Sequence, residues 1–466
     1  MHILSKSTFI KGEQCQKALY MYKKHPYLRD KLSIEQRAKF KRGTDVGVLA
    51  RTYFPDGINM TPSSPSLFQK MFEKTMENLN NPDINTMYEA IFIYNDTLIM
   101  LDILVRDGDK WRAIEVKSSL SLSETYYKDA ALQYYVLNGC KVPISDMQLM
   151  YINNEYVKNG DIDVKQLFIF KSVKDYAEQQ LNIIDKKVNE YKSVVALNNA
   201  PRINIGTQCF SPYKCEFLGH CWKKIPQDSF LHTTDYSDKE LFSLYNSGIT
   251  DNRSFKKIID PLSLEMSQIE TLEQNTYYLN YKTFYDLIGK RTESIAFLNI
   301  LFYRPAVPIL EGHKPYQEIV LAFSILSNTD NTVVNWNCLE DYSMMEDGLK
   351  ILTEELGRYE KIIYFSEQNL NILMHRYNII ESKDISHKII NLRDILKESD
   401  YFSKKTKYNF TLKSIYEGLF DKDEVFEHSR IILNATSENQ LERILVEKDM
   451  EEENVYLQKI HKKLMP

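Results

Sequence analysis

The sequence lacks the features that mark membrane, secreted or motor proteins. It contains no apolar run that approaches the roughly 18 residues of a membrane span. Its first residues, Met-His-Ile-Leu-Ser-Lys-Ser, lack the apolar region of a secretory signal peptide. It has no internal repeat, no low-complexity stretch and no Gly-Lys-Thr phosphate loop, so no ATP-driven motor is present in this polypeptide. We therefore expect a cytoplasmic protein without a membrane partner.

The sequence also lacks a strong charge of either sign. Its formal net charge is −5, which by itself does not indicate nucleic-acid binding. Such binding is not excluded, because an enzyme channel needs local positive potential rather than a basic whole protein. With 466 residues, of which 43% are hydrophobic, the chain is long enough for two or three domains with their own cores.

One stretch predicts three consecutive β-strands. Its apolar segments are separated by the dipeptides Asn95-Asp96 and Gly108-Asp109, which are residue types that tight hairpin turns require. The prediction is a three-stranded antiparallel meander. Its strands are expected at Tyr88–Tyr94, Thr97–Val105 and Trp111–Ser118.

The two turns predict which residues face each other across the meander. They place Glu89 opposite Asp102, and Asp102 opposite Glu115. Directly opposed residues hold their Cβ atoms about 5 Å apart, and like charges there are destabilising. A divalent cation removes that repulsion, because hard ions such as Mg²⁺ and Mn²⁺ are held by carboxylates. Glu89, Asp102 and Glu115 are therefore candidate metal ligands.

A lysine joins these acids. Side chains alternate along a strand, so Glu115 and Lys117 point to the same face. Acids and a lysine on adjacent strands suit a metal-dependent phosphodiester hydrolase, in which the ion activates a water and the ammonium neutralises developing charge. The plainer interpretation of residues 115–117 is a solvated strand edge, and the bare tripeptide favours it. The equal thirteen-residue spacing of Glu89, Asp102 and Glu115 across two turns favours the metal site.

Segments 101–104 (Leu-Asp-Ile-Leu) and 114–119 (Ile-Glu-Val-Lys-Ser-Ser) resemble the core of the PD-(D/E)XK nuclease superfamily. The resemblance is strongest to the RecB-type branch that includes the CRISPR-associated Cas4 nucleases. It implies that Asp102 and Glu115 bind Mg²⁺ or Mn²⁺ and that Lys117 is the catalytic lysine. It also implies a glutamine on the following helix that reaches the site, and Gln133 stands at that position.

The chain departs from this family at two positions. Four residues after the glutamine the better-known relatives have tyrosine, but this sequence has Leu137, so that role passes to Tyr134 or is absent. Many RecB-type nucleases also have a metal-binding histidine on a helix near residues 40–51, and none is present here. Either Glu89 supplies the missing ligand or the enzyme is weaker than its relatives. Arg42 and Arg51 on this helix are candidate phosphate contacts, although solvated surface arginines are commoner.

The six cysteines lack the Cys-x₂₋₄-Cys pairs of a zinc ribbon. In a cytosolic chain, metal ligands or free thiols are commoner than disulfides. Cys140 and Cys338 are isolated and are expected to be buried free thiols. The other four resemble the iron–sulfur clamp of Cas4-like and AddB-like nucleases, which implies a [4Fe–4S] cluster, with zinc at the same ligands as the alternative. These four are Cys15, Cys209, Cys215 and Cys221.

The pattern changes after residue 226, with a helical bridge expected at 227–294 and a second α/β pattern at 295–466. The whole order resembles a DUF2779-type family, which joins a Cas4-like nuclease, here residues 1–226, to a DnaQ-like exonuclease domain of the RNase H fold. Acidic positions of that second domain are Asn299, Leu301 and Asn391 in this chain, which leaves too little charge for two Mg²⁺ ions. We expect an inactive exonuclease fold retained for binding or positioning.

The expected fold class is therefore α/β, with a PD-(D/E)XK domain and an RNase H-like domain. The expected function is that of a Mg²⁺- or Mn²⁺-dependent deoxyribonuclease, acting as an exonuclease on single-stranded DNA ends. Its setting would be DNA repair or prokaryotic defence, with protein partners from such a complex. Two alternatives are a nucleic-acid-binding scaffold and a nuclease that acts on RNA, since acids and a lysine do not read the 2′-OH. The missing histidine favours the scaffold. Four intact residues favour catalysis: Asp102, Glu115, Lys117 and Gln133.

Overall fold

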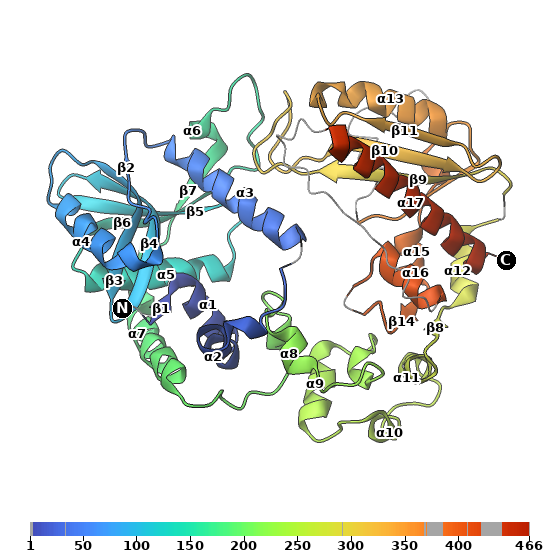
Figure 1. Ribbon diagram of the computed structural model, residues 1–466, viewed down its shortest axis with the longest axis horizontal. Helices are drawn as coiled ribbons and strands as arrows, with labels where there is room; N and C mark the ends of the chain where they lie inside the picture. The colour runs from blue at the N-terminus through green and yellow to red at the C-terminus, as the bar shows by residue number, and fades with distance from the viewer. Residues whose placement is uncertain are drawn as a thin grey trace. The chain divides into compact units, whose positions relative to one another are not determined.

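The structure, a computed structural model, describes residues 3–32, 34–290, 292–367, 370, 385–407, 409–420 and 440–465. The chain is a mixed α/β protein, as the sequence predicts (Figure 1). It divides into two compact units. Unit 1 contains Met1–Lys223 and Pro305–Gln317, and unit 2 contains Lys224–Arg304 and Glu318–Pro466. The predicted helical bridge, 227–294, is thus part of unit 2.

Unit 1 is built on a seven-stranded mixed sheet with the order β2-β3-β4-β5-β6-β7, in which β1 also pairs with β4. The predicted meander is confirmed, because β3, β4 and β5 pair antiparallel in sequence. Strand β6 then pairs parallel with β5. The strands are β1 Leu4–Ser5, β2 Ile58–Asn59, β3 Thr86–Tyr94, β4 Thr97–Asp107, β5 Lys110–Lys117, β6 Ile144–Ile152 and β7 Phe168–Ser172.

Helices cover both faces of this sheet. Because side chains alternate between the two faces, neighbouring residues of one strand enter different cores. On β5, Ala113 enters the larger core with α1, α2, α5 and α7, whereas Ile114 enters a second core beside α3. The helices of unit 1 are α1 Lys6–Gln14, α2 Gln16–Lys24, α3 Ile34–Arg51, α4 Phe68–Leu79, α5 Glu124–Gly139, α6 Val164–Leu167, α7 Lys174–Ala196 and α8 Leu218–Trp222. Short 3₁₀ helices are η1 Pro26–Leu28, η2 Pro65–Leu67 and η3 Thr207–Cys209.

Helix α5 is buried along most of its length. Its residues 129–137 are all buried, and most of them are apolar. A helix that is apolar on all sides lies inside a domain rather than on its surface. Two polar residues in this segment, Asp129 and Gln133, are therefore held inside the protein at positions four residues apart, on one face of the helix.

The segment 305–317 packs within unit 1. In the sequence it lies between two strands of unit 2, β9 Ile295–Tyr303 and β10 Ile319–Ser327. Ala306 lies in the core that contains Ile103 and Ile114 of the meander. The backbone N–H of Gly312 donates to the carbonyl of Lys158 at 2.8 Å, and the N–H of Lys158 donates to the carbonyl of His313 at 3.0 Å. We call these thirteen residues the crossing segment.

The crossing segment also reaches the end of β5. The Tyr316 hydroxyl donates a hydrogen bond to the carbonyl of Ser118, the residue that follows Lys117. Lys158 forms an ion pair with Glu311, whose other oxygen accepts a hydrogen bond from the backbone of Gly160 at 2.8 Å. Unit 1 is therefore incomplete without residues that are remote from it in sequence.

Ala306→Asp tests this packing, because it places an unpaired carboxylate in an apolar core where Ala306 is 5% exposed. We expect unit 1 to lose about 3–5 kcal/mol of stability. Thermal unfolding and the rate of proteolysis between residues 305 and 317 measure this. Lys314→Ala is the control: its salt bridge with Glu155 is on the surface, and its loss changes stability by about 0.5 kcal/mol or less. An unchanged Ala306→Asp protein contradicts the assignment of the segment to unit 1.

Unit 2 contains a five-stranded sheet with the order β11-β10-β9-β12-β13. Strands β9, β10 and β11 pair antiparallel, whereas β12 and β13 are parallel to β9. A separate pair joins β8 and β14. The strands are β8 Tyr277–Tyr278, β9 Ile295–Tyr303, β10 Ile319–Ser327, β11 Val333–Asn337, β12 Lys361–Tyr364, β13 Ile389–Asn391 and β14 Phe402–Ser403.

Helices cover β10 from both faces, and all nine of its residues are buried. Trp336 of β11 stacks on Phe323 and lies against Gly348 of α13, while Asn454 of α17 donates to the Ser324 carbonyl at 2.9 Å. The helices of unit 2 are α9 Asp238–Asn246, α10 Asn252–Phe255, α11 Leu264–Gln274, α12 Tyr281–Ile288, α13 Met345–Leu356, α15 Leu392–Glu398, α16 Leu412–Phe420 and α17 Gln440–Leu464, with η4 Phe230–His232, η5 Tyr342–Met344 and η7 Ser386–Lys388. In the described part of the chain, every helix is too short or too polar to cross a membrane.

Candidate active site

The register of the meander brings the predicted acids to one level of the sheet. Strands β3 and β4 pair Ala90 with Leu101, and strands β4 and β5 pair Ile103 with Ile114, so both predicted registers are confirmed. The three acids adjoin these pairs and interact electrostatically. They are Glu89 on β3, Asp102 on β4 and Glu115 on β5.

Glu115 is the centre of this group and is only 2% exposed. Its Oε1 lies 2.7 Å from the Nζ atom of Lys117 and 2.7 Å from that of Lys6. Its Oε2 accepts a hydrogen bond of 2.8 Å from Gln133 Nε2. Burial alone would raise the pKa of Glu115, but the ammonium groups of Lys117 and Lys6 hold it well below its usual value. Glu115 is therefore ionised throughout the neutral range.

Lys117 is fixed by a second carboxylate. Its Nζ lies 2.5 Å from Oδ2 of Asp129 on α5. The same ammonium lies 5.0 Å from the ring centre of Tyr126, one turn earlier on α5, in a cation–π contact. Burial alone would lower the pKa of Lys117, but Asp129 and Glu115 raise it above its usual value. The lysine is therefore charged and held from two sides.

Gln133 contacts the site through the nitrogen of its side-chain amide. The side chain is fully buried, and its Nε2 donates to Glu115. Its Oε1 has no hydrogen-bond partner among the described residues. A buried acceptor without a donor is unfavourable by about 1–3 kcal/mol. The sequence prediction that Gln133 reaches the acids is confirmed in its geometry, and the free Oε1 is available to a water or an ion.

Asp102 lies beside this group with little positive charge of its own. Its Oδ2 accepts a hydrogen bond of 2.7 Å from the backbone N–H of Val116. Burial, and then the neighbouring Glu115 carboxylate, raise the pKa of Asp102 to about 8. The site therefore carries more negative charge than its cations balance, which favours either a proton or another cation near Asp102.

Glu89 forms an ion pair with α3, the helix on which the resemblance leads us to expect a metal-binding histidine. Arg51 of α3 donates to Glu89 Oε1 at 2.7 Å and stacks over the ring of Tyr88. Glu89 has a φ of 53°, in the left-handed region that β-carbon-bearing residues rarely adopt. Burial raises its pKa, although Arg51 opposes the shift. Arg51, predicted as a phosphate contact, thus binds an acid of the site.

Tyr134 does not take the place of the tyrosine that Leu137 replaces. Its hydroxyl donates to Glu178 of α7 at 2.8 Å, away from Glu115. Leu137 is fully buried in the core of unit 1. The aromatic residue at the lysine is Tyr126 instead.

The sequence prediction gave no role in the site to Lys6 or to Asp129, although Asp129 was expected on the same helix face as Gln133. The helical spacing of Asp129 and Gln133 was a usable signal, because residues four apart share a face. Lys6 gave no such signal, since it is 109 residues away from Glu115. It is brought there by β1, which pairs with β4 just before α1 begins.

The types of donor atom at this site suit a hard cation. Carboxylate and amide oxygens are the ligands that Mg²⁺ and Mn²⁺ prefer. Among the described residues, however, no three His, Cys, Asp or Glu side chains form a group that could hold a metal ion. Glu115 forms ion pairs with the ammonium groups of Lys6 and Lys117, and Glu89 forms one with the guanidinium group of Arg51.

The four cysteines of the proposed cluster lie near one another in unit 1. Cys15 separates α1 from α2, and the backbone N–H of Cys215 donates to the Cys209 carbonyl at 2.8 Å. Burial raises the pKa of the Cys215 thiol to about 11, and Cys15, Cys209 and Cys221 add to the rise. All four are free thiols, and so are Cys140, half-buried, and Cys338, buried. The donor type fits a cluster, although the side chains as they lie do not form a metal-binding group among the described residues.

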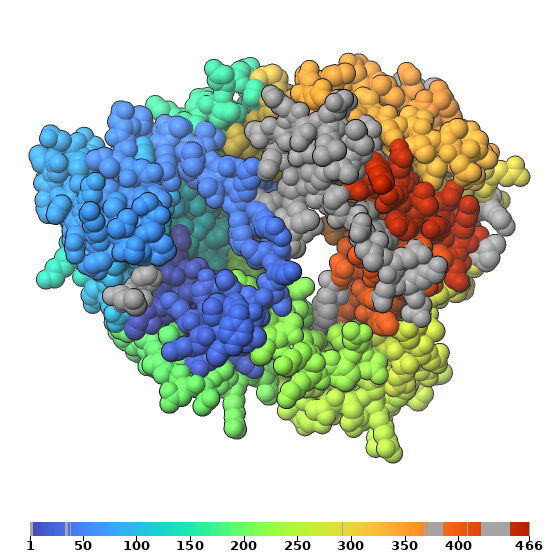
Figure 2. Space-filling view, in the orientation of Figure 1, coloured from blue at the N-terminus to red at the C-terminus, as the bar shows by residue number. Residues whose placement is uncertain are grey.

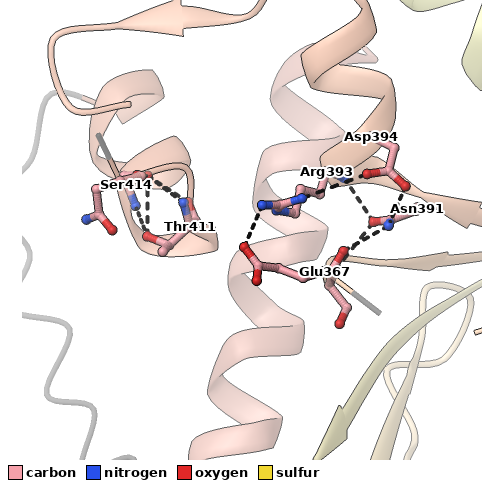
Figure 3. Close-up of polar contacts among 8 residues, drawn as sticks. Glu367, Asn391, Arg393, Asp394, Thr411 and Ser414 are labelled. Atoms are coloured by element: carbon pink, nitrogen blue, oxygen red, sulfur yellow. Dashed lines mark hydrogen bonds and ion pairs between the residues drawn. The ribbon is translucent and has the colours of Figure 1, made fainter. Parts of the chain in front are cut away.

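In unit 2, Asn391, where the resemblance leads us to expect an acid, takes part in other interactions (Figure 3). Asn391 donates to the Ser366 carbonyl at 2.9 Å and to Asp394 at 2.8 Å, and it caps α15 by accepting from the Arg393 N–H at 3.2 Å. Arg393 pairs with Glu367 at 2.6 Å. A second network at the start of α16, visible in the same view, joins Thr411 to Ser414. These side chains stabilise loops and helix ends.

Asn299 and Leu301, where the resemblance also leads us to expect acids, have structural contacts as well. Asn299 of β9 donates a hydrogen bond to Glu453 of α17. Leu301 packs against the small core formed by Ala322 and Met450. An amide and an apolar side chain cannot supply the charge that two metal ions need.

The chain matches no protein-family model and no curated protein. What can be inferred about function therefore comes from the geometry of Glu115 and its neighbours.

Asp102→Asn tests the surplus negative charge. The pKa of Asp102 is about 8 in the folded chain and about 4 in an unfolded one, so between these values the unfolded state releases its proton more readily. Ionisation therefore destabilises the wild type as pH rises from about 4 to about 8, by at most ~1.4 kcal/mol per pH unit, and Asp102→Asn removes this loss.

Thermal unfolding in EDTA at about pH 5, 6.5 and 8 measures the effect. The stability advantage of Asp102→Asn should widen with pH. Asp109→Asn, in the exposed turn before β5, is the matched control and should show no such widening. A constant difference between Asp102→Asn and wild type would contradict the proposed shift.

Proposed function

We propose that unit 1 is a phosphodiester hydrolase that acts on DNA. The observation that carries this proposal is the convergence of three groups on the buried Glu115 carboxylate. Asp102 adjoins it on the neighbouring strand, Lys117 contacts it from two residues further along β5, and Gln133 reaches it from α5. A carboxylate pair, an ammonium and an amide in one place suit the hydrolysis of an anionic ester.

Each residue has a role that suits its position. Asp102 and Glu115 would hold Mg²⁺ or Mn²⁺, which when bound activates a water and withdraws charge from a phosphate oxygen. Lys117 is held between Glu115 and Asp129, from where its ammonium can neutralise charge that develops on the phosphate. The unpaired Oε1 of Gln133 can accept a hydrogen bond from the attacking water.

The residues also support the PD-(D/E)XK relationship that the sequence suggests. The acid pair adjoins a confirmed antiparallel register, and the following helix carries Gln133 to the same carboxylate. We further propose single-stranded DNA ends as the substrate and DNA repair or defence against foreign DNA as the setting.

One observation favours a second candidate, a nucleic-acid-binding scaffold. In the described geometry two of the acids form ion pairs, Glu115 with Lys6 and Lys117 and Glu89 with Arg51. Such pairing would also suit a site that has lost its metal. The unpaired Gln133 Oε1 and the raised pKa of Asp102 favour the enzyme. Both features lower the stability of the fold, and a site with a purely structural role has no need of them.

For unit 2 we propose an inactive exonuclease fold of the RNase H type. A five-stranded mixed sheet in which three antiparallel strands are followed by two parallel ones supports this relationship. The amides of Asn299 and Asn391 hold structural hydrogen bonds. The role of unit 2 would then be to bind or position the nucleic acid or a protein partner.

Glu115→Gln and Lys117→Met test the enzyme. We expect either change to lower the rate of degradation of linear single-stranded DNA with Mn²⁺ by about 100-fold or more, since each removes a group that acts on the phosphate. Glu367→Gln is the control, because this acid is 78% exposed, lies in unit 2 and pairs with Arg393. It should leave the rate unchanged.

The substrates should include circular single-stranded DNA and RNA beside the linear DNA. Degradation of the linear form alone identifies an end-dependent enzyme. Degradation of RNA in preference to DNA supports the RNA nuclease. If the wild type degrades none of them but binds DNA, the scaffold is the better description of the protein.

For the four thiols of residues 15, 209, 215 and 221 we propose a [4Fe–4S] cluster that ties the N-terminal helices to the end of unit 1. Protein purified without oxygen should be brown and should lose both colour and acid-labile sulfide in the Cys209→Ser and Cys221→Ser variants. Cys140→Ser is the matched control and should stay brown. Colourless wild-type protein that contains zinc would establish the alternative metal, and metal-free protein would contradict both.

A further inference from the structure

Lys6 is brought to the candidate site by the first strand of the chain. Leu4 and Ser5 of β1 pair in parallel with Thr97 and Leu98 of β4, and α1 begins immediately afterwards at Lys6. The ammonium of Lys6 then lies 2.7 Å from Glu115 Oε1. Lys6 therefore places a second ammonium group directly on the Glu115 carboxylate.

Two ammonium groups share a single oxygen atom of Glu115. The ammonium of Lys117 also contacts Asp129, so it is shared between two carboxylates. The second ammonium repels the first, and Lys6 accordingly opposes the protonation of Lys117. Beside them the fully buried Gln133 leaves its Oε1 without a donor among the described residues. Two like charges on one carboxylate oxygen and an unpaired buried acceptor therefore lie in one small group of side chains.

Of the two lysines, Lys6 is the one that can leave. Lys117 is 13% exposed, is held by Glu115 and Asp129, and lies over the Tyr126 ring. Lys6 is 31% exposed, and Glu115 is its one ion-pair partner among the described residues. Helices α1 and α2 form part of the surface of unit 1 (dark blue in Figure 2). A long side chain at a surface helix can swing out without unfolding anything.

We propose that Lys6 is a substrate-binding lysine that occupies the cation position on Glu115 in the metal-free protein and binds a phosphate oxygen of the nucleic acid once a divalent ion displaces it. The inference rests on the proposed function of unit 1. In the described geometry Lys6 covers Oε1 of Glu115, an oxygen that the ion would need.

Lys6→Met separates the two roles, since it keeps the length of the side chain and removes its charge. Mn²⁺ should bind about tenfold more tightly to this variant than to wild type, because a competing cation is gone. Electron paramagnetic resonance of free Mn²⁺ measures this without any catalytic turnover.

At saturating Mn²⁺ the same variant should bind DNA more weakly. We expect KM for linear single-stranded DNA to rise about three- to tenfold with little change in kcat. Loss of one phosphate contact should also make the dependence of log affinity on log salt less steep, by about 0.7. A purely structural role would weaken both ligands together and would leave the salt dependence as it is.

Lys11→Met is the matched control, because Lys11 lies on the same helix and pairs with Glu216 at 2.6 Å, away from Glu115. It should change neither affinity. If the wild type neither binds Mn²⁺ nor degrades nucleic acid, the proposed function has failed. If the wild type degrades DNA but Lys6→Met binds Mn²⁺ no more tightly, or keeps its KM and salt dependence, the inference about Lys6 is wrong and the enzyme stands.

The wild-type chain provides a test that needs no variant and so does not depend on Lys6→Met folding. Acetylation of lysines by an N-hydroxysuccinimide ester, read by mass spectrometry, should increase several-fold at Lys6 when Mn²⁺ is added. The acetylation of Lys11 should not change. An unchanged or lower reactivity of Lys6 in protein that binds Mn²⁺ would overturn the proposal.

Discussion

The structure of unit 1 depends on how one buried carboxylate is compensated. Glu115 is 2% exposed, and an unpaired carboxylate at such a position would be unfavourable by several kcal/mol. Its partners come from the start of α1, from β5 itself and from α5. Lys117 and Gln133 lie within hydrogen-bond distance of its two oxygens, so this one group fixes β5 and the buried helix α5 relative to each other, and Lys6 adds the start of α1 in the described geometry.

The sequence was sufficient for the three-stranded meander and for half of the site. The dipeptides at the two turns predict the registers of β3, β4 and β5, and the alternation of side chains then places Glu115 and Lys117 on one face. These are local signals, carried by residues that are close in sequence. The same holds for Gln133, because a helix directly after the strand brings it back over the sheet.

The remainder of the site depends on contacts that no local pattern encodes. Lys6 comes from 109 residues away, the Arg51 that pairs with Glu89 from 38, and Tyr316, which contacts the Ser118 carbonyl, from 198. Each requires the tertiary fold before it can be seen. The left-handed backbone of Glu89 is similar, since a strand pattern predicts extended geometry there.

Helix α1 connects the acids to the cysteines. It begins at Lys6, whose ammonium lies on Glu115, and it ends at Cys15, which is its C-terminal cap. A helix of nine residues is about 14 Å long, so Lys6 and Cys15 stand at opposite ends of one short element. The position of Cys15 and the position from which Lys6 reaches the acids are therefore linked through the backbone of α1, without any contact between the thiol and the carboxylates.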